Sequence, residues 1–317
     1  MRVDDPRFCV GVFHDRLVPF GSGGVDVIHG PDLRIPRFRR IPAVSTVHDL
    51  SSLDVPGIAG ERFQRKKLLA LADVAERAAV ILCVSEFTER SFLGRFPTAA
   101  GRTRVVPHGL AVRFGPQRTA AVNAVLAKRG LSRPYLLFVG QISARKNLMP
   151  LLRAFEALRS RGPLRDLELV IAGPVQTGGD EIVEAARTSP HAAAIRFLGF
   201  IDDDELPALY AGAAVFVFPG KGEGFGIPIL EAMACGAPVV AANAGANPST
   251  AGDAAVCVDG DSADEFAAAI EHLLTDDAAR AAQIERGLRR AGEFTWAETA
   301  RRTVEAYRDA VRIGAVA

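Results

Sequence analysis

Aromatic residues, cysteine and net charge are all scarce in this sequence, and each scarcity excludes something. Aromatic residues make up 7% of the 317 residues, so alanine, valine, leucine and isoleucine must build the hydrophobic cores. The formal net charge of +1 gives no support for nucleic-acid binding, because proteins of that class carry an excess of positive charge. No apolar run approaches the roughly 20 residues of a membrane-spanning helix, and the first residues lack the apolar core of a signal peptide.

The four cysteines form no CxxC pair and indicate neither a disulfide nor a metal site. Cys83 and Cys257 lie inside apolar runs, where cysteine behaves as a small buried hydrophobe. Since disulfides persist in oxidising compartments, this usage indicates a reducing one. The sequence therefore predicts a cytoplasmic protein.

Basic residues do gather locally, in Arg34–Arg40 and in Arg62–Lys67. Clusters of this kind often form a solvated face. They are also typical of contact with an anionic membrane surface or an acidic acceptor. Both interpretations stay open, and the second predicts peripheral contact with the inner face of a membrane.

Val-, Ile- and Leu-rich runs alternate with Ala-rich amphipathic runs along the chain. This alternation predicts an α/β protein with doubly wound parallel sheets, and the length predicts two domains. Residues 111–133 are polar and Ala-rich, so we interpret them as a connection and expect the domain boundary after residue 130. The clearest expected strands are Ala43–Val47, Val80–Val84, Tyr135–Val139, Leu167–Ala172, Ala214–Phe218 and Pro238–Ala242.

Doubly wound sheets bind ligands beyond the carboxyl ends of their strands, and the loop after Tyr135–Val139 carries two cations. Arg145 and Lys146 stand just before a helix that Asn147 can cap. A helix N-terminus offers free N–H groups and a partial positive charge, which suits a diphosphate. The alternative is a pair of solvated surface charges.

The loop after Ala214–Phe218 carries three glycines and two carboxylates. Glu223 lies in the loop and Glu231 in the helix that Pro228 opens. Carboxylates accept hydrogen bonds from hydroxyl groups, so the pair can face one ligand, one holding a sugar and the other a ribose. The alternatives are a solvated loop residue at Glu223 and, at Glu231, a carboxylate that only favours the helix N-terminus.

The remaining polar candidates give weaker evidence of a functional site. His48 follows the strand Ala43–Val47, where it either contacts a ligand or is a capped, hydrogen-bonded side chain. Gly21–Gly24 is interpreted as a simple turn, since no helix follows it. Asp202–Asp204 and Asp259–Asp261 precede helices at ordinary cap positions. The sequence therefore predicts no metal site.

The stretch EGFGIPILEAMACGAPVV, from Glu223 to Val240, resembles the E-x7-E signature of the retaining GT-B glycosyltransferases of family 4. FVGQISARKNL resembles the strand and phosphate loop of that family, and FTWAETARRTVEAY resembles its terminal helix. The resemblance covers roughly residues 26–312 and implies two Rossmann-like domains facing across a cleft. Residues 1–130 are expected to form an acceptor-side domain that is incomplete at its start, residues 131–295 a nucleotide-sugar domain, and residues 296–317 a helix crossing back to the first domain.

Site roles follow from this resemblance position by position. Arg145 and Lys146 are expected to bind the diphosphate and steady it as it leaves. Glu223, with the backbone of Phe225 and Gly226, is expected to hold the donor sugar. Further donor contacts are expected from Glu231 at the ribose, the Ile201 backbone near the base, His48 at the sugar, and Gly140 and Ile227.

The reaction implied by the resemblance is transfer of a hexose with its anomeric configuration kept, through an oxocarbenium-like state. The donor is expected to be a nucleotide sugar such as GDP-mannose, the acceptor a glycan or lipid-linked molecule of surface polysaccharide assembly, and no cofactor or metal is expected. The alternative is an inactive nucleotide-sugar-binding protein or an N-terminally truncated pseudoenzyme. A nicotinamide-dependent dehydrogenase is disfavoured, because no strand–GxGxxG–helix unit occurs.

Overall fold

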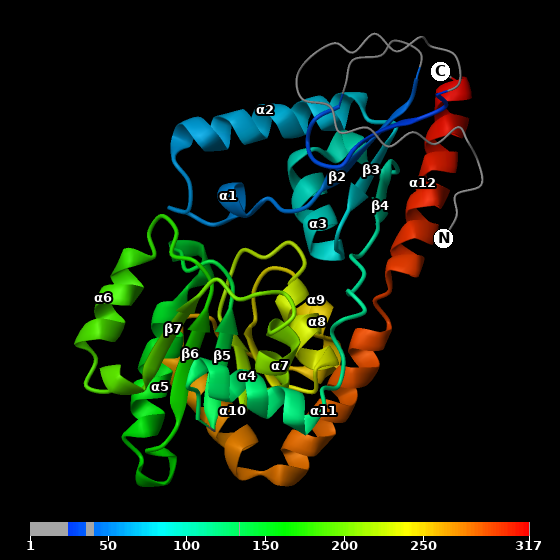
Figure 1. The fold of residues 1–317 in the computed structure, drawn as a ribbon. Helices are drawn as coiled ribbons and strands as arrows, with labels where there is room; N and C mark the ends of the chain where they lie inside the picture. Colours follow the sequence, from blue (N-terminus) through cyan, green and yellow to red (C-terminus); the bar gives the residue numbers. More distant parts are fainter. Residues whose placement is uncertain (1–24, 36–40, 133, 317) are drawn as a thin grey trace. The chain divides into compact units, whose positions relative to one another are not determined.

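The computed structural model describes residues 25–35, 41–132 and 134–316, and the chain forms two compact units (Figure 1). The first unit combines the residues up to Gly109 with Thr295–Ala317, and the second is Leu110–Phe294. The boundary lies after Gly109 rather than after residue 130. The reason is that the interpreted connection contains helix α4 (Thr119–Arg129), which packs against α7 (Leu206–Gly212) of the second unit.

In the described part of the first unit, four parallel strands follow one another in the sheet: β1 (Ile28–Gly30), β2 (Ala43–Val47), β3 (Val80–Cys83) and β4 (Thr103–Val105). Strands β2 and β3 are buried along their whole length, as expected where both faces of a sheet are covered. Helices α2 (Glu61–Arg77) and α3 (Glu86–Arg95) cover one face, with Leu71, Val74 and Phe92 in the core.

Helix α12 (Trp296–Val316) covers the other face of this sheet, where Ala306 and Ala310 pack with Val44, Val80 and Leu82. A short helix, α1 (Ser51–Asp54), follows β2. Ser85 caps α3, since its hydroxyl oxygen accepts the Thr88 backbone N–H at 3.0 Å. The predictions for Cys9, for the Gly21–Gly24 turn and for the start of the first domain lie outside the described residues.

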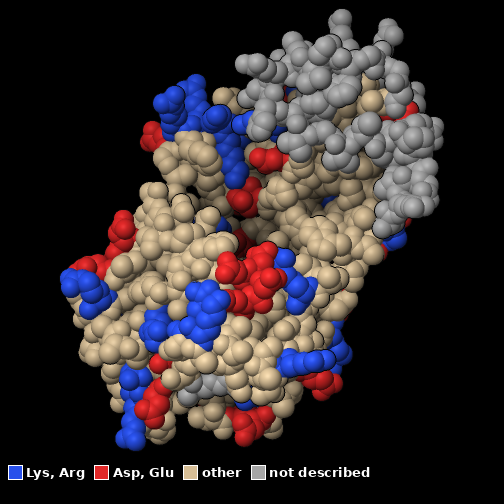
Figure 2. All heavy atoms as spheres, in the orientation of Figure 1, with Lys and Arg blue, Asp and Glu red and all other residues tan. Residues whose placement is uncertain are grey.

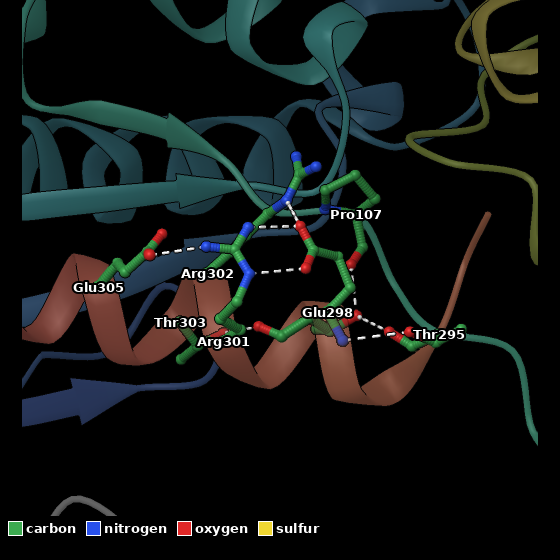
Figure 3. Close-up of polar contacts among 8 residues, drawn as sticks. Pro107, Thr295, Glu298, Arg301, Arg302, Thr303 and Glu305 are labelled. Carbon is green, nitrogen blue, oxygen red and sulfur yellow. Dashed lines mark hydrogen bonds and ion pairs between the residues drawn. The ribbon is translucent and has the colours of Figure 1, made fainter.

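The beginning of α12 is tied to the loop after β4 (Figure 3). Thr299 Oγ1 donates to the Pro107 carbonyl at 2.8 Å, and the Thr295 hydroxyl accepts the Glu298 N–H at 3.2 Å. The Glu298 carboxylate accepts from Arg301 and Arg302. Exposed ion pairs of this kind contribute little stability, so the Thr299 bond and the alanine packing fix where the helix starts.

The second unit holds a six-stranded parallel sheet in the order β10-β9-β8-β5-β6-β7 within the described residues. Its strands are β5 (Tyr135–Val139), β6 (Glu168–Ala172), β7 (Ile195–Gly199), β8 (Val215–Phe218), β9 (Val239–Ala242) and β10 (Val256–Val258). Besides α4 and α7, its helices are α5 (Leu148–Arg159), α6 (Asp180–Thr188), α8 (Ile227–Ala234), α9 (Asn247–Ala251), α10 (Ala263–Thr275) and α11 (Asp277–Gly292).

The strand order of this sheet changes direction between β5 and β8. The chain runs outward from β5 to β7, and then outward on the other side from β8 to β10. This is a doubly wound sheet, so the predicted α/β fold class is confirmed. Such sheets bind ligands at the change of direction, beyond the carboxyl ends of the two central strands, which directs attention to the loops after β5 and β8.

Two kinds of feature are absent from the described residues. None of the helices there is both long and apolar enough to cross a membrane. No three His, Cys, Asp or Glu side chains there are grouped as ligands of a metal ion.

Candidate functional site

The loop after β5, Gly140–Asn147, ends in a short 3₁₀ helix, η2 (Ala144–Lys146). Gly140 has a φ of +150°, a backbone conformation that other residues rarely adopt, and a Cβ atom there would lie 3.2 Å from Cζ of Phe138. Asn147 precedes α5 with a φ of +50° and does not cap it, because a capping residue needs extended backbone. Its Nδ2 instead donates to the Gly260 carbonyl at 2.8 Å, which holds this β5 loop against the turn after β10.

The two cations of the β5 loop meet one carboxylate from the loop after β8. Lys146 Nζ lies 2.8 Å and Arg145 Nη1 lies 2.6 Å from Glu223 Oε1. The Lys146 side chain is 8% exposed, and its ammonium lies 5.0 Å from the centre of the Phe218 ring. Burying an ammonium group without a counter-charge costs free energy, so Glu223 stabilises the buried position of Lys146 and the half-buried position of its neighbour Arg145. Three predicted site residues are therefore in direct contact at the change of strand direction.

The loop after β8, residues 219–226, is braced by the segment after β9. The Glu223 carbonyl accepts the Ala246 N–H at 2.9 Å, and the Phe225 carbonyl accepts the Thr250 hydroxyl. Gly226 ends this β8 loop with a φ of +96°, a left-handed conformation that suits glycine. Hydrogen bonds from the segment after β9 therefore help to fix the conformation of the β8 loop.

Asn247 is a site residue that sequence reasoning missed. It is fully buried, and its Nδ2 donates to the carbonyls of Gly220 and Ala242 at 2.8 and 3.2 Å. Its Oδ1 has no hydrogen-bond partner in the described part of the chain, and it would lie 3.4 Å from a Cβ atom at Gly226. A polar residue directly before Pro248 was the available signal, but nothing in the sequence pairs it with a loop more than twenty positions earlier.

Glu231 lies on α8 and does not join the cluster of Arg145, Lys146 and Glu223. Its Oε2 accepts the Tyr210 hydroxyl of α7 at 2.9 Å. Burial raises the pKa of the Glu231 carboxyl, while the Tyr210 hydrogen bond and the Arg113 charge oppose that rise and the Asp203 charge adds to it. The two predicted carboxylates therefore have different environments, one paired with cations and one with a phenol.

The other predicted donor contacts of the second unit differ in their exposure. Ile201 follows β7 and is 7% exposed, next to Phe200, which is 75% exposed. Phe225 is buried and meets Phe294 edge to face, with 5.7 Å between the ring centres, and Ile227 is 37% exposed at the start of α8. Their roles toward a donor stay predictions.

His48 belongs to the first unit and follows β2. Its Nε2 lies 2.8 Å from the Pro31 carbonyl, and its ring stacks on His108 at 5.4 Å between centres. Burial and the nearby His48 lower the pKa of His108 to about 4. His48 is therefore an exposed ring held by a backbone bond, and its contact with a sugar stays a prediction.

The cluster of the second unit can act as an anion site. Two cations from η2 share one carboxylate oxygen, and an incoming diphosphate can replace that carboxylate as their partner. Hydrogen bonds between Arg or Lys and phosphate are charge-assisted and therefore strong. A site of this composition can hold a phosphorylated ligand and can stabilise negative charge that develops on it.

Two family models together match most of the chain. "Glycosyl transferases group 1" matches residues 127–290, and "Glycosyltransferase Family 4" matches residues 15–114. The O-antigen chain mannosyltransferase B of Escherichia coli is 33% identical over 283 residues, which cover 89% of this chain and 74% of that protein. The chain belongs to glycosyltransferase family 4. The predicted family and the prediction of a transferase are confirmed.

This glycosyltransferase spans less of some other relatives. The D-inositol 3-phosphate glycosyltransferase of Salinispora arenicola is 32% identical over 287 residues, but only 64% of that protein is covered. Among solved structures, a sucrose-phosphate synthase from Thermosynechococcus elongatus has a TM-score of 0.75 and 25% identity, covering 90% of this chain and 74% of that one. Anabaena HepE in complex with UDP-glucose has a TM-score of 0.68 and 19% identity, covering 84% and 71%. These similarities identify the fold as GT-B.

Proposed function

We propose that this family 4 protein transfers a hexose, namely mannose, from GDP-mannose to a glycan or lipid-linked acceptor. The observation that carries the proposal is the contact of Arg145 and Lys146 with Glu223 at the change of strand direction. The similarity to an O-antigen chain mannosyltransferase supports the sugar, and the similarity to a protein solved with UDP-glucose supports a nucleotide-sugar donor.

In the proposed reaction the anomeric configuration is kept and no metal takes part. Arg145 and Lys146 bind the diphosphate and stabilise its growing charge as the glycosidic bond breaks. Glu223, released from the cations by the diphosphate, accepts hydroxyl hydrogens of the donor sugar, and Glu231 accepts those of the ribose. The departing phosphate takes the proton of the acceptor hydroxyl, so attack occurs on the face that the leaving group vacates.

We further propose that the protein acts at the cytoplasmic face of a membrane, through the first half of α2. Figure 2 shows Lys and Arg side chains gathered over this helix. Arg62, Arg65 and Lys66 are exposed there beside Phe63 and Leu69, whose exposed fractions are 57% and 64%. Basic residues attract anionic lipids and exposed apolar side chains insert among them. The buried thiols of Cys83 and Cys235 support a reducing compartment.

Two variants test the donor site. Lys146→Ala and Glu231→Ala are each expected to remove most transfer from GDP-mannose and to weaken binding of GDP, measured by a radiolabelled transfer assay and by calorimetry. Arg161→Ala is the control, because this cation pairs with Glu271 near the far end of α5.

The outcomes separate the alternatives. Unchanged turnover in both variants overturns the proposed site. Binding of GDP without transfer by the unaltered protein favours the inactive binding protein. A thermal-shift panel of nucleotide sugars identifies the donor, because a ligand raises the melting temperature according to its affinity, and a larger shift with UDP-glucose than with GDP-mannose refutes the proposed donor.

A further inference from the structure

The surroundings of Glu231 contain groups that the donor site as described does not use. The carboxylate lies on α8 between Leu230 and Ala232, which are both buried in the core. Its Oε2 accepts the Tyr210 hydroxyl, whereas its Oε1 has no hydrogen-bond partner among residues that the structure describes. One oxygen is therefore held from inside the protein and the other is left to accept.

Tyr210 is built to donate a hydrogen bond to this carboxylate. Its side chain is completely buried, and its ring makes edge-on contacts with Phe114 and Phe216, at 6.0 and 5.3 Å between centres. Burial, together with the Glu231 charge, raises the pKa of Tyr210 well above its ordinary value. The phenol therefore keeps its proton and can only present it to Glu231 in one orientation.

Three consecutive residues of the segment before α4 also meet this region. Arg113 pairs with Asp203 at 2.7 Å, and its charge lowers the pKa of Glu231. Phe114 packs on Tyr210, and the Gly115 N–H donates to the sulfur of Cys235, one helical turn beyond Glu231. The segment that the sequence suggested was only a connection thus contacts Tyr210 and Cys235, two neighbours of Glu231.

The remaining elements around α8 add no competing charge. Helix α9 has no titratable side chain. Helix α11 turns Gly287 toward Met233 of α8 and directs Arg286 and Arg290 to backbone carbonyls of residues 249–253. The titratable groups that face Glu231 are therefore Tyr210 from α7, Arg113 and Asp203 from the segments before α4 and α7, and Cys235 on α8 itself.

We propose that Tyr210 and Arg113 are positioning residues that keep the Glu231 carboxylate charged and aim its Oε1 atom at a pair of ligand hydroxyl groups. The inference rests on the proposed function, in which those hydroxyls belong to the ribose of the nucleotide. Burial alone favours the protonated acid, which has a hydrogen to donate and less capacity to accept. The hydrogen bond from Tyr210 and the positive charge of Arg113 oppose that tendency. The negative charge of Asp203 offsets part of the effect of Arg113.

Direct titration of Glu231 tests the positioning by itself. Glutamate labelled with ¹³C at the side-chain carboxyl is followed by NMR against pH, and Glu231→Gln identifies the signal. We expect a higher pKa for Glu231 in Tyr210→Phe and in Arg113→Gln, and a lower one in Asp203→Asn. The opposite sign for Asp203→Asn separates an electrostatic role from simple damage to the fold.

The salt dependence of the Glu231 pKa distinguishes the effect of Arg113 from that of Tyr210. Arg113 and Asp203 have side chains that are 46% and 62% exposed, so their effects should shrink between 50 mM and 500 mM salt. The Tyr210 bond is buried, so the effect of Tyr210→Phe should persist. Tyr135→Phe is the matched control, because it removes a buried hydroxyl that donates to the Leu209 carbonyl of the same helix. Arg289→Gln, which breaks an exposed pair on α11, is the control for Arg113→Gln.

Calorimetry with GDP connects the positioning to binding. We expect Tyr210→Phe to weaken binding about tenfold at pH 7 and to move the acidic loss of affinity to higher pH. Tyr210→Phe in a Glu231→Gln background should have no further effect. Equal Glu231 titration in the wild type, Tyr210→Phe and Arg113→Gln overturns the proposal. Equal GDP affinity of Glu231→Gln and the wild type overturns the proposed ribose role instead, whatever the titrations give.

Discussion

The two units place different chemistry on the same kind of parallel sheet. The second unit gathers fixed charges after β5 and β8, namely Arg145, Lys146 and Glu223. The first unit gathers imidazoles on and after its strands, and burial together with the nearby His48 lowers the pKa of His29 and His108 to about 4. The charged loops of the second unit therefore suit an anion, whereas His29 and His108 of the first unit are neutral hydrogen-bonding groups.

The largest effect on activity is expected when the negative charge of Glu223 in the second unit is removed. Glu223→Gln should lower sugar transfer by about two to three orders of magnitude, because the sugar loses a charged acceptor. Binding of GDP itself should not weaken, since the diphosphate no longer has to displace a carboxylate from Arg145 and Lys146. Transfer assays and calorimetry measure the two effects.

Glu223→Gln supports a role in sugar binding only if turnover falls while the affinity for GDP does not. Parallel losses of GDP affinity and turnover would mean that Glu223 maintains the cations rather than binds the sugar. Lys146→Ala is the reference, because that variant should lose both.

A smaller effect, on stability, is expected from the half-buried imidazole of His29 in the first unit. His29 lies 2.7 Å from the Tyr307 hydroxyl and 2.8 Å from Thr46 Oγ1, and burial, with the His48 charge, lowers its pKa from 6.5 to about 4. Between these values the unfolded chain binds the proton and the folded chain does not, so stability falls as pH falls. The free energy of unfolding should fall by on the order of 3 kcal/mol from this cause as the pH drops from 6.5 to about 4. His29→Gln should abolish this pH-dependent loss.

Urea unfolding at pH 7, 5.5 and 4.5 measures this slope. His272, exposed on α10, provides the control His272→Gln, which should leave the slope unchanged. The same acid sensitivity in His29→Gln and the wild type would show that the neutral imidazole is not what distinguishes the first unit.

The comparison extends to the helices that cover the sheets. Helix α5 buries Leu151, Leu152 and Phe155 against the second sheet, whereas the first half of α2 leaves Phe63 and Leu69 exposed beside basic side chains. Arg65→Gln should lower binding to vesicles containing 30% phosphatidylglycerol about fivefold, because each basic residue near such a surface contributes roughly 1 kcal/mol. Arg289→Gln on α11 should not change the binding, measured by flotation. Wild-type protein that stays off the vesicles would refute the membrane proposal.

The smallest effect is expected from the exposed charge pair beside the donor loops. Lys221 pairs with Asp261, and their side chains are 30% and 69% exposed. Asp261→Asn should change the free energy of unfolding by less than about 1 kcal/mol, measured by urea unfolding, and turnover should stay within roughly twofold. A large loss of turnover would show that charge near the loops matters generally, and not only where it is buried as at Lys146.

The order of strands and helices was readable from the sequence, because apolar periodicity reports which faces are buried. The strands Ala43–Val47 and Tyr135–Val139 have the bounds that their patterns predict. The loops with Arg145, Lys146 and Glu223 were also readable, since each follows a strand of a parallel sheet. Helix α4 was missed because its Ala-rich pattern gives a weak amphipathic signal, with Val122 and Leu126 as its buried residues.

The residue pattern was thus enough to predict the α/β class, the family resemblance and the loops that carry the charged side chains. The tertiary structure alone decided the partners: Arg145 with Glu223, 78 positions apart, and Tyr210 with Glu231, 21 positions apart. It also decided that Arg113 belongs to the second unit and that Asn147 bonds to Gly260 rather than to its own helix. The reason is that local patterns specify which side of an element is buried, whereas the neighbours of a side chain follow from strand order, which long-range packing sets.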